Sequence, residues 1–87
     1  MSYYFAKTLE TDFESAVQRA TEALKQHGFG IITQIDVRDT FKNKLAVDFR
    51  DYRILGACNP QLAHEALQIE DKVGTMLPCN VVVQDLG

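Results

Sequence analysis

Apolar residues recur along the chain with two different periods, and the changes of period divide it into strands and helices. Aromatic and apolar residues dominate residues 3–9, and apolar and polar residues alternate over residues 29–37, so two strands are predicted there. Between them, apolar residues recur every three or four positions over residues 13–24, which predicts an amphipathic helix. Gly28 is predicted to end this helix, because glycine readily takes the left-handed conformation that closes a helix.

The second half of the chain is predicted to contain shorter elements. Apolar residues spaced by four favour a short helix within residues 37–45 over the alternative, a strand. Strands are predicted over residues 52–57 and 80–84, with a helix from Pro60 and a loop over residues 70–74 between them. The consecutive valines of the last strand are typical of burial on both faces, so a central position in the sheet is predicted. This order predicts an α+β fold, a two-layer sandwich of a mostly antiparallel sheet with helices packed on one face.

Two motifs predict where helices begin. Thr11 and Glu14 are the ends of a capping box, in which each side chain accepts a hydrogen bond from the backbone N–H of the other residue. Asn59 is a preferred N-cap residue, and Pro60 suits the first position of a helix. Cys58 therefore lies next to a helix N-terminus, where free N–H groups favour an anion and would stabilise a thiolate.

Composition and charge narrow the class of protein. The chain has 87 residues, which suits one domain spanning residues 1–87. Its net charge is −3 and its 9 Lys and Arg residues are scattered, so nucleic acid is not expected as a partner. The first residues lack the pattern of a signal peptide, and no apolar run approaches about 18 residues, so we expect a cytoplasmic protein with no membrane partner.

The two cysteines are the residues best suited to chemistry. In a reducing compartment they are expected to be free thiols rather than a disulfide. One interpretation makes both of them small, packed side chains without reactivity. The other pairs Cys58 and Cys79 for redox chemistry, for handling sulfur species or for binding a soft metal such as Cu(I). Their spacing is neither that of a CxxC motif nor that of a zinc site, so no metal site is predicted beyond these two candidate ligands.

The candidate binding residues lie at junctions between predicted elements. Cys58 and Asn59 join a strand to a helix, and Cys79 and Asn80 lie where a loop meets the last strand. If the sheet places these junctions side by side, the two thiols would face one pocket. Lys44 is a further candidate, because its charge could draw an anion toward the thiols. The sequence contains no phosphate-binding loop, catalytic triad or dinucleotide motif, so no catalytic residue or cofactor is predicted.

Several of these motifs resemble those of a known family. The segments Gly56-Ala57-Cys58-Asn59-Pro60 and Leu77-Pro78-Cys79-Asn80 are similar to motifs of the domain of unknown function 302 family. The resemblance covers nearly the whole chain. It implies a small two-layer α+β domain that is often dimeric, and it implies no activity, because none is established for the family. Members commonly continue with a further strand and a C-terminal helix, which this chain is expected to lack.

A missing strand and helix would leave part of the sheet uncovered, and a second copy could cover it. We therefore expect a homodimer. Two functions stay open: a binding or interaction module with structural cysteine junctions, and a thiol-based protein that uses Cys58 and Cys79. The sequence favours a module over an enzyme, but it does not decide between the two functions or identify a small-molecule or metal ligand. Separated and buried sulfur atoms would indicate the module, and close, accessible ones the thiol-based protein.

Overall fold

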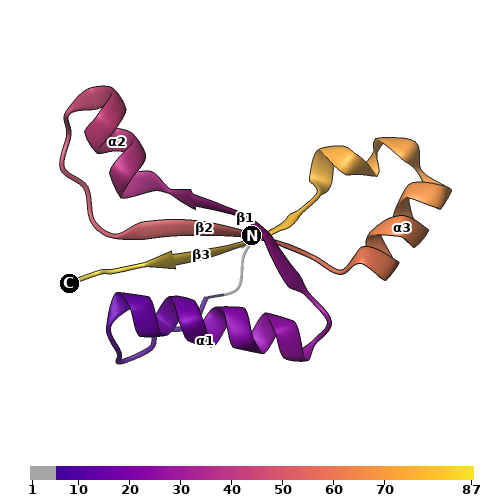
Figure 1. Cartoon of the computed structure of the whole chain (residues 1–87), viewed down its shortest axis with the longest axis horizontal. Coiled ribbons are helices and arrows are strands. Elements are labelled where there is room, and N and C mark those ends of the chain that lie inside the picture. The colour runs from indigo at the N-terminus through magenta and orange to yellow at the C-terminus, as the bar shows by residue number, and fades with distance from the viewer. Residues whose placement is uncertain (1–5) are drawn as a thin grey trace.

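The computed structural model describes residues 6–87, in which helices and strands alternate along the sequence (Figure 1). The elements, in chain order, are α1 (Phe13–Gln26), β1 (Gly30–Asp36), α2 (Val37–Leu45), β2 (Tyr52–Cys58), α3 (Pro60–Ile69), the 3₁₀ helix η1 (Asp71–Met76) and β3 (Cys79–Gln84). These strands form an antiparallel sheet in the order β1-β2-β3. The predicted α+β fold with an antiparallel sheet is confirmed.

Helix α1 covers one face of the sheet. Antiparallel pairing places Leu55 of β2 opposite Val81 of β3, and the side chains of paired residues point to the same face. Leu55 and Ala57 are fully buried, and Val17 of α1 is buried with them. Figure 1 shows α1 running alongside the strands, while α2 and α3 lie beyond opposite ends of the sheet. The core therefore lies between α1 and this face.

The other face of the sheet is largely open in the described part of the chain. Ile54 lies at its centre, between Ile35 of β1 and Val82 of β3. Ile54 is half-buried, whereas Ile35 is 50% exposed and Val82 is 45% exposed. This face therefore presents aliphatic side chains to solvent, where a one-sided antiparallel sheet ordinarily carries polar ones.

Local hydrogen bonds set the start of α1, and they correct the predicted capping box. Asp12, not Thr11, caps the helix: its carboxylate accepts hydrogen bonds from the Ser15 N–H at 2.8 Å and the Ser15 hydroxyl at 3.0 Å. These bonds lower the pKa of Asp12. Glu14 does not complete the box, because its carboxylate pairs with Arg53 at 3.1 Å. The helix therefore begins one residue later than predicted.

Most of the other predicted elements are present. The short helix predicted within residues 37–45 is α2, and the residue after it, Ala46, caps its C-terminus with a left-handed φ of 54°. The segment 70–74, predicted to be a loop, lies mostly within η1. The strand predicted over residues 3–9 falls partly outside the described residues, and residues 6–9 have no regular secondary structure.

The valine run predicts a central position for β3, and this prediction is wrong for the described sheet, because β3 lies at its edge. Successive side chains of a strand point to opposite faces. Val81 and Val83 therefore face α1, and Val82 points to the open face. The strand that has neighbours on both sides is β2. A run of apolar residues thus indicates two apolar faces, and it does not distinguish an edge strand from a central one.

Candidate functional site

Asn59 and Pro60 begin α3 as predicted. The Asn59 side chain accepts a hydrogen bond from the Leu62 N–H at 3.1 Å, and Pro60 is the first residue of the helix. Asn59 also lies against the turn after α1, because a Cβ atom added to Gly28 would be 3.1 Å from the Asn59 side-chain nitrogen. Gly28 has a φ of 84°, a conformation that favours glycine. Asn59 thus connects the start of α3 to the end of α1.

The sheet brings the two predicted junctions side by side, but it separates their thiols. Cys79 pairs with Ala57, and Asn80 pairs with Gly56. Cys58 follows Ala57 in β2 and so points to the opposite face from Ala57 and from Cys79. Cys79 is exposed, Cys58 is half-buried, and both are free thiols. The expectation that the two thiols face one pocket is therefore wrong, because the strand register gives them opposite directions.

Gly56, within the first junction motif, has no room for a side chain. A Cβ atom at this position would collide with the Thr33 hydroxyl and lie 3.0 Å from Cγ of Pro78. Thr33 belongs to β1 and Pro78 precedes β3, so both neighbours of β2 close over the glycine. From the sequence, Gly56 is only part of a motif. Its need to be glycine could not be predicted, because the atoms that exclude a side chain belong to residues far away in the sequence.

Lys44 lies at the other end of the sheet from the cysteines. It is exposed on α2, which precedes the Tyr52 end of β2, whereas Cys58 is the last residue of that strand. Figure 1 shows α2 beyond one end of the sheet and α3 beyond the other. The neighbouring Lys42 pairs with Asp48 at 3.1 Å. Lys44 therefore does not belong to the cysteine junctions.

Arg53 is a charged residue on the covered face that the periodicity of the sequence does not single out. Its side chain is 18% exposed and pairs with Glu14 at 3.1 Å and with Asp36 at 3.7 Å. The guanidinium carbon also lies 5.2 Å from the centre of the Phe13 ring. Arg53 thus ties the start of α1 to the sheet. The signal that could have found it is its parity in β2, which places it on the same face as Leu55.

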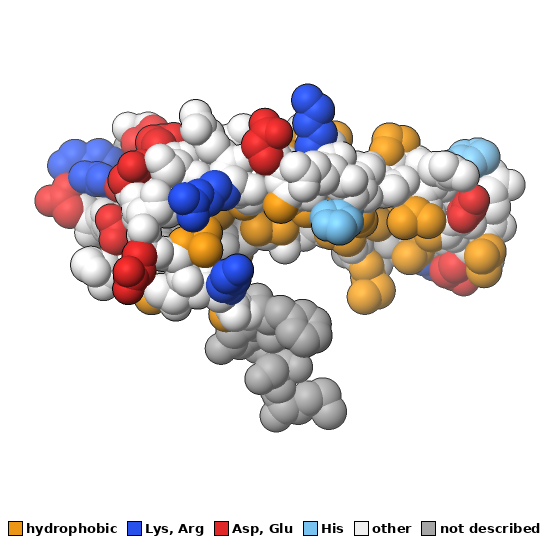
Figure 2. All heavy atoms as spheres, turned by 90° about the horizontal axis from the view of Figure 1, so that it is seen from below, with side chains coloured by type: hydrophobic (Ala, Val, Ile, Leu, Met, Phe, Trp, Pro, Cys, Tyr) orange, Lys and Arg blue, Asp and Glu red, His pale blue; other side chains and the backbone are white. Residues whose placement is uncertain are grey.

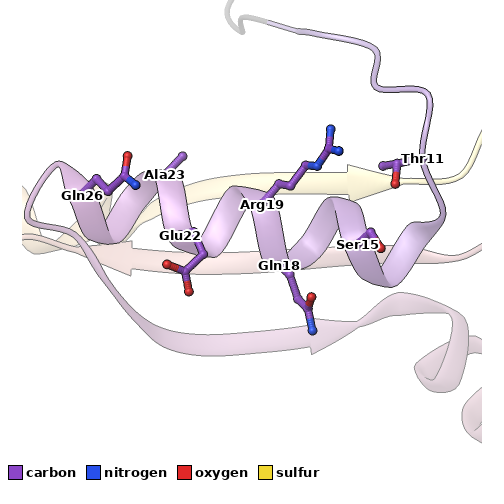
Figure 3. Close-up of a pocket in the computed structure, with 7 residues that line it drawn as sticks. All are labelled: Thr11, Ser15, Gln18, Arg19, Glu22, Ala23 and Gln26. Atoms are coloured by element: carbon purple, nitrogen blue, oxygen red, sulfur yellow. The ribbon is translucent and has the colours of Figure 1, made fainter.

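Two hollows beside α1 are lined mainly by polar side chains. The first, of about 480 Å³, is bordered by Thr11, Ser15, Gln18, Arg19, Glu22, Ala23 and Gln26. Figure 3 shows these side chains spread along the helix, with Arg19 and Glu22 directed to different sides. The second, of about 560 Å³, lies beside Arg53 and Gln34.

Within residues 6–87, no group of three His, Cys, Asp or Glu residues could hold a metal ion. None of the helices in this part of the chain is long and apolar enough to cross a membrane.

The fold and the two junction motifs define a class of small α+β domains with a helix-covered antiparallel sheet. The family model described as domain of unknown function DUF302 matches residues 5–87, and the chain belongs to this family. The chain is similar to a solved structure, the uncharacterized conserved protein DUF302 from Bacillus stearothermophilus, with 38% sequence identity and a TM-score of 0.80. The match covers 86% of this chain and 59% of the other chain. No curated protein matches the chain.

Proposed function

We propose that this chain is a homodimeric binding or interaction module whose cysteine junctions hold the backbone in place. The observation that carries the proposal is the amount of surface that one copy exposes. The 87 residues expose 7155 Å², whereas a compact monomer of 9.8 kDa exposes about 5,200 Å². The radius of gyration is 14.9 Å, against about 12 Å for a compact domain of this length.

The excess surface is as large as a protein interface requires. It amounts to roughly 2,000 Å² per chain, and each partner of a standard interface buries about 800 Å². Large apolar side chains are exposed both on the sheet and on the α3–η1 segment. In Figure 2, charged side chains gather toward the α2 end, and hydrophobic side chains are exposed along the middle and toward the α3 end. A second copy would remove part of this apolar surface from water, which stabilises the assembly.

The cysteine junctions fit a structural role. Asn59 caps α3, Gly56 admits no side chain, and the thiols of Cys58 and Cys79 point to opposite faces of the sheet. Each of these features is accounted for by packing or backbone hydrogen bonding without a ligand. A cytoplasmic location is part of the proposal, since both cysteines are free and free thiols persist in reducing compartments.

A thiol-based function is the second candidate, and the exposure of Cys79 favours it. An exposed thiol can exchange with disulfides or bind a soft metal, because reagents reach its sulfur atom. Cys58 lies next to the N-terminus of α3, where the free N–H groups of the helix favour a negatively charged group. The opposite directions of the two side chains weigh against a shared site, so each thiol would act alone.

The dependence of thermal unfolding on protein concentration tests the homodimer. Because a dimer releases two chains when it unfolds, its Tm should rise by roughly 4 °C for each tenfold increase in concentration. Circular dichroism melts over a hundredfold range of concentration measure this slope. A Tm that does not change with concentration would contradict the proposal.

A further inference from the structure

We infer that two copies of the chain pack against each other through the open face of the sheet. The open face is the side of β1, β2 and β3 turned away from α1, and Ile35, Ile54 and Val82 lie at its centre. This inference rests on the proposed homodimer and goes beyond it, because it names the contact surface and makes a second copy its occupant.

The distribution of charge between the two faces supports this surface. The charged residues of the strands are Asp36 and Arg53, and they pair with each other on the face that α1 covers. The open face receives no Asp, Glu, Lys or Arg from the described strands, although it is the face that solvent reaches in one copy. An identical face can therefore approach it without repulsion between like charges.

The ends of the open face are polar and suit the rim of an interface. Thr33 and Asn80 lie at one end, on either side of Gly56. At the other end, Arg50 donates a hydrogen bond to Oε1 of Gln84 at 2.9 Å, and its guanidinium lies 5.6 Å from the centre of the Tyr52 ring. An apolar centre surrounded by a polar rim, with tyrosine and arginine enriched, is typical of surfaces that bind proteins.

The valine run of β3 indicates that both faces of this strand are covered. Val81 and Val83 pack on the side of α1, and Val82 is 45% exposed between them. Strands with continuous apolar residues are ordinarily buried on both sides. A second copy lying on the open face would bury Val82, and both faces of β3 would then be covered, as its valine run indicates.

A two-fold contact through the open face would stack the sheets of the two copies. Three strands spaced about 4.8 Å apart and rising about 3.4 Å per residue over seven residues make a face of about 14 by 24 Å. In most soluble homodimers the same patch of each copy meets its equivalent about a two-fold axis. Two sheets stacked in this way lie about 10 Å apart, with their strands turned by about 30°. The resulting order of layers is helix, sheet, sheet, helix.

The α3–η1 segment provides a matched control surface. Ile69 is 86% exposed at the end of α3, and α3 packs against η1 beyond the end of the sheet. A glutamate at Ile69 adds the same charge as one at Val82 or Ile35, and it does so away from the open face.

The test is sedimentation equilibrium of the full chain and of the variants Val82→Glu, Ile35→Glu and Ile69→Glu. Val82 and Ile35 are half exposed in one copy, so a glutamate there is compatible with the folded chain, and far-UV circular dichroism checks that folding is retained. Val82→Glu and Ile35→Glu should raise the dimer Kd on the order of 100-fold or more, because each interface would bury two like charges. Ile69→Glu should leave the Kd within a few fold of the wild-type value.

The outcomes distinguish a wrong contact surface from a wrong oligomeric state. If the wild type is a dimer and the two open-face variants remain dimers with unchanged Kd, the inferred surface is wrong and the homodimer stands. A monomeric wild type overturns both. Should a glutamate variant fail to fold, Val82→Thr keeps a β-branched side chain of similar shape and only replaces one methyl group with a hydroxyl. Its Kd should rise by several fold, and an unchanged Kd would equally overturn the surface.

Discussion

At Gly56, the atoms of Thr33 and Pro78 leave no space for a methyl group. We expect Gly56→Ala to lower the free energy of unfolding by about 1–3 kcal/mol, the usual cost of overpacking. Gly30 in β1 is the control, because a Cβ atom there would meet nothing within 4 Å. Gly30→Ala should change the same quantity by less than about 0.5 kcal/mol. Urea unfolding measures both variants, and equal effects would contradict the packing argument.

The cap at Asn59 gives a second prediction at the residue scale. Asn59→Ala removes the acceptor for the Leu62 N–H and should cost about 1 kcal/mol of stability. Asn59→Asp should retain most of that stability, because aspartate caps helices as well as asparagine does. If Asn59→Ala is as stable as the wild type in urea, the residue has a role other than capping.

The directions of the two thiols give a third prediction. Mild oxidation should not join Cys58 to Cys79 within one chain, because their side chains point to opposite faces of the sheet and a disulfide requires Cβ atoms about 4 Å apart. Mass spectrometry of unreduced peptides detects such a bond. Exposed Cys79 should also react with an alkylating agent faster than half-buried Cys58. An intrachain disulfide would favour the thiol-based function over the module.

The elements whose apolar residues alternate or recur at a regular period could be predicted from the sequence. The period of apolar residues predicts α1, β1, α2, β2 and α3, including α2 and α3, neither of which has a buried residue. The cap of α1 could not be chosen, because Thr11 and Asp12 are both suitable and the choice depends on Arg53, which binds Glu14 across 39 positions. Local sequence carries no information about that contact.

The same limit applies to the candidate site. The placement of both junctions at one end of the sheet follows from antiparallel pairing of neighbouring strands, and the cap at Asn59 is a local signal. The direction of each thiol depends on which residues of β2 and β3 pair, and a shift of one residue would reverse it. The register is set by packing of Leu55 and Val81 under α1, which no short motif encodes.

The start of α1 also predicts a dependence on pH. Hydrogen bonds from Ser15 hold the pKa of Asp12 below its ordinary value of 3.8. A carboxylate of this kind stabilises the fold above that ordinary value, and its contribution is lost as the pH falls through the lowered pKa of the folded state. Asp12→Asn can still cap the helix but does not titrate, so its Tm should fall less on acidification below about pH 4. Identical acid profiles of the two proteins would show that Asp12 does not contribute.

In the whole molecule, one face of the sheet is covered and the other is open to solvent. The described chain places α1 on one face of its sheet and leaves Ile35 and Val82 half exposed on the other. The strand charges lie on the covered face, so the open face is unusually apolar for a surface in water. The described part of the chain therefore has more apolar surface than its own elements cover.

Sedimentation equilibrium of the unmodified chain at micromolar concentration measures the central claim directly. The homodimer predicts a mass of twice 9.8 kDa that decreases toward the single-chain value only on strong dilution. A single-chain mass of 9.8 kDa over the whole micromolar range would contradict the account.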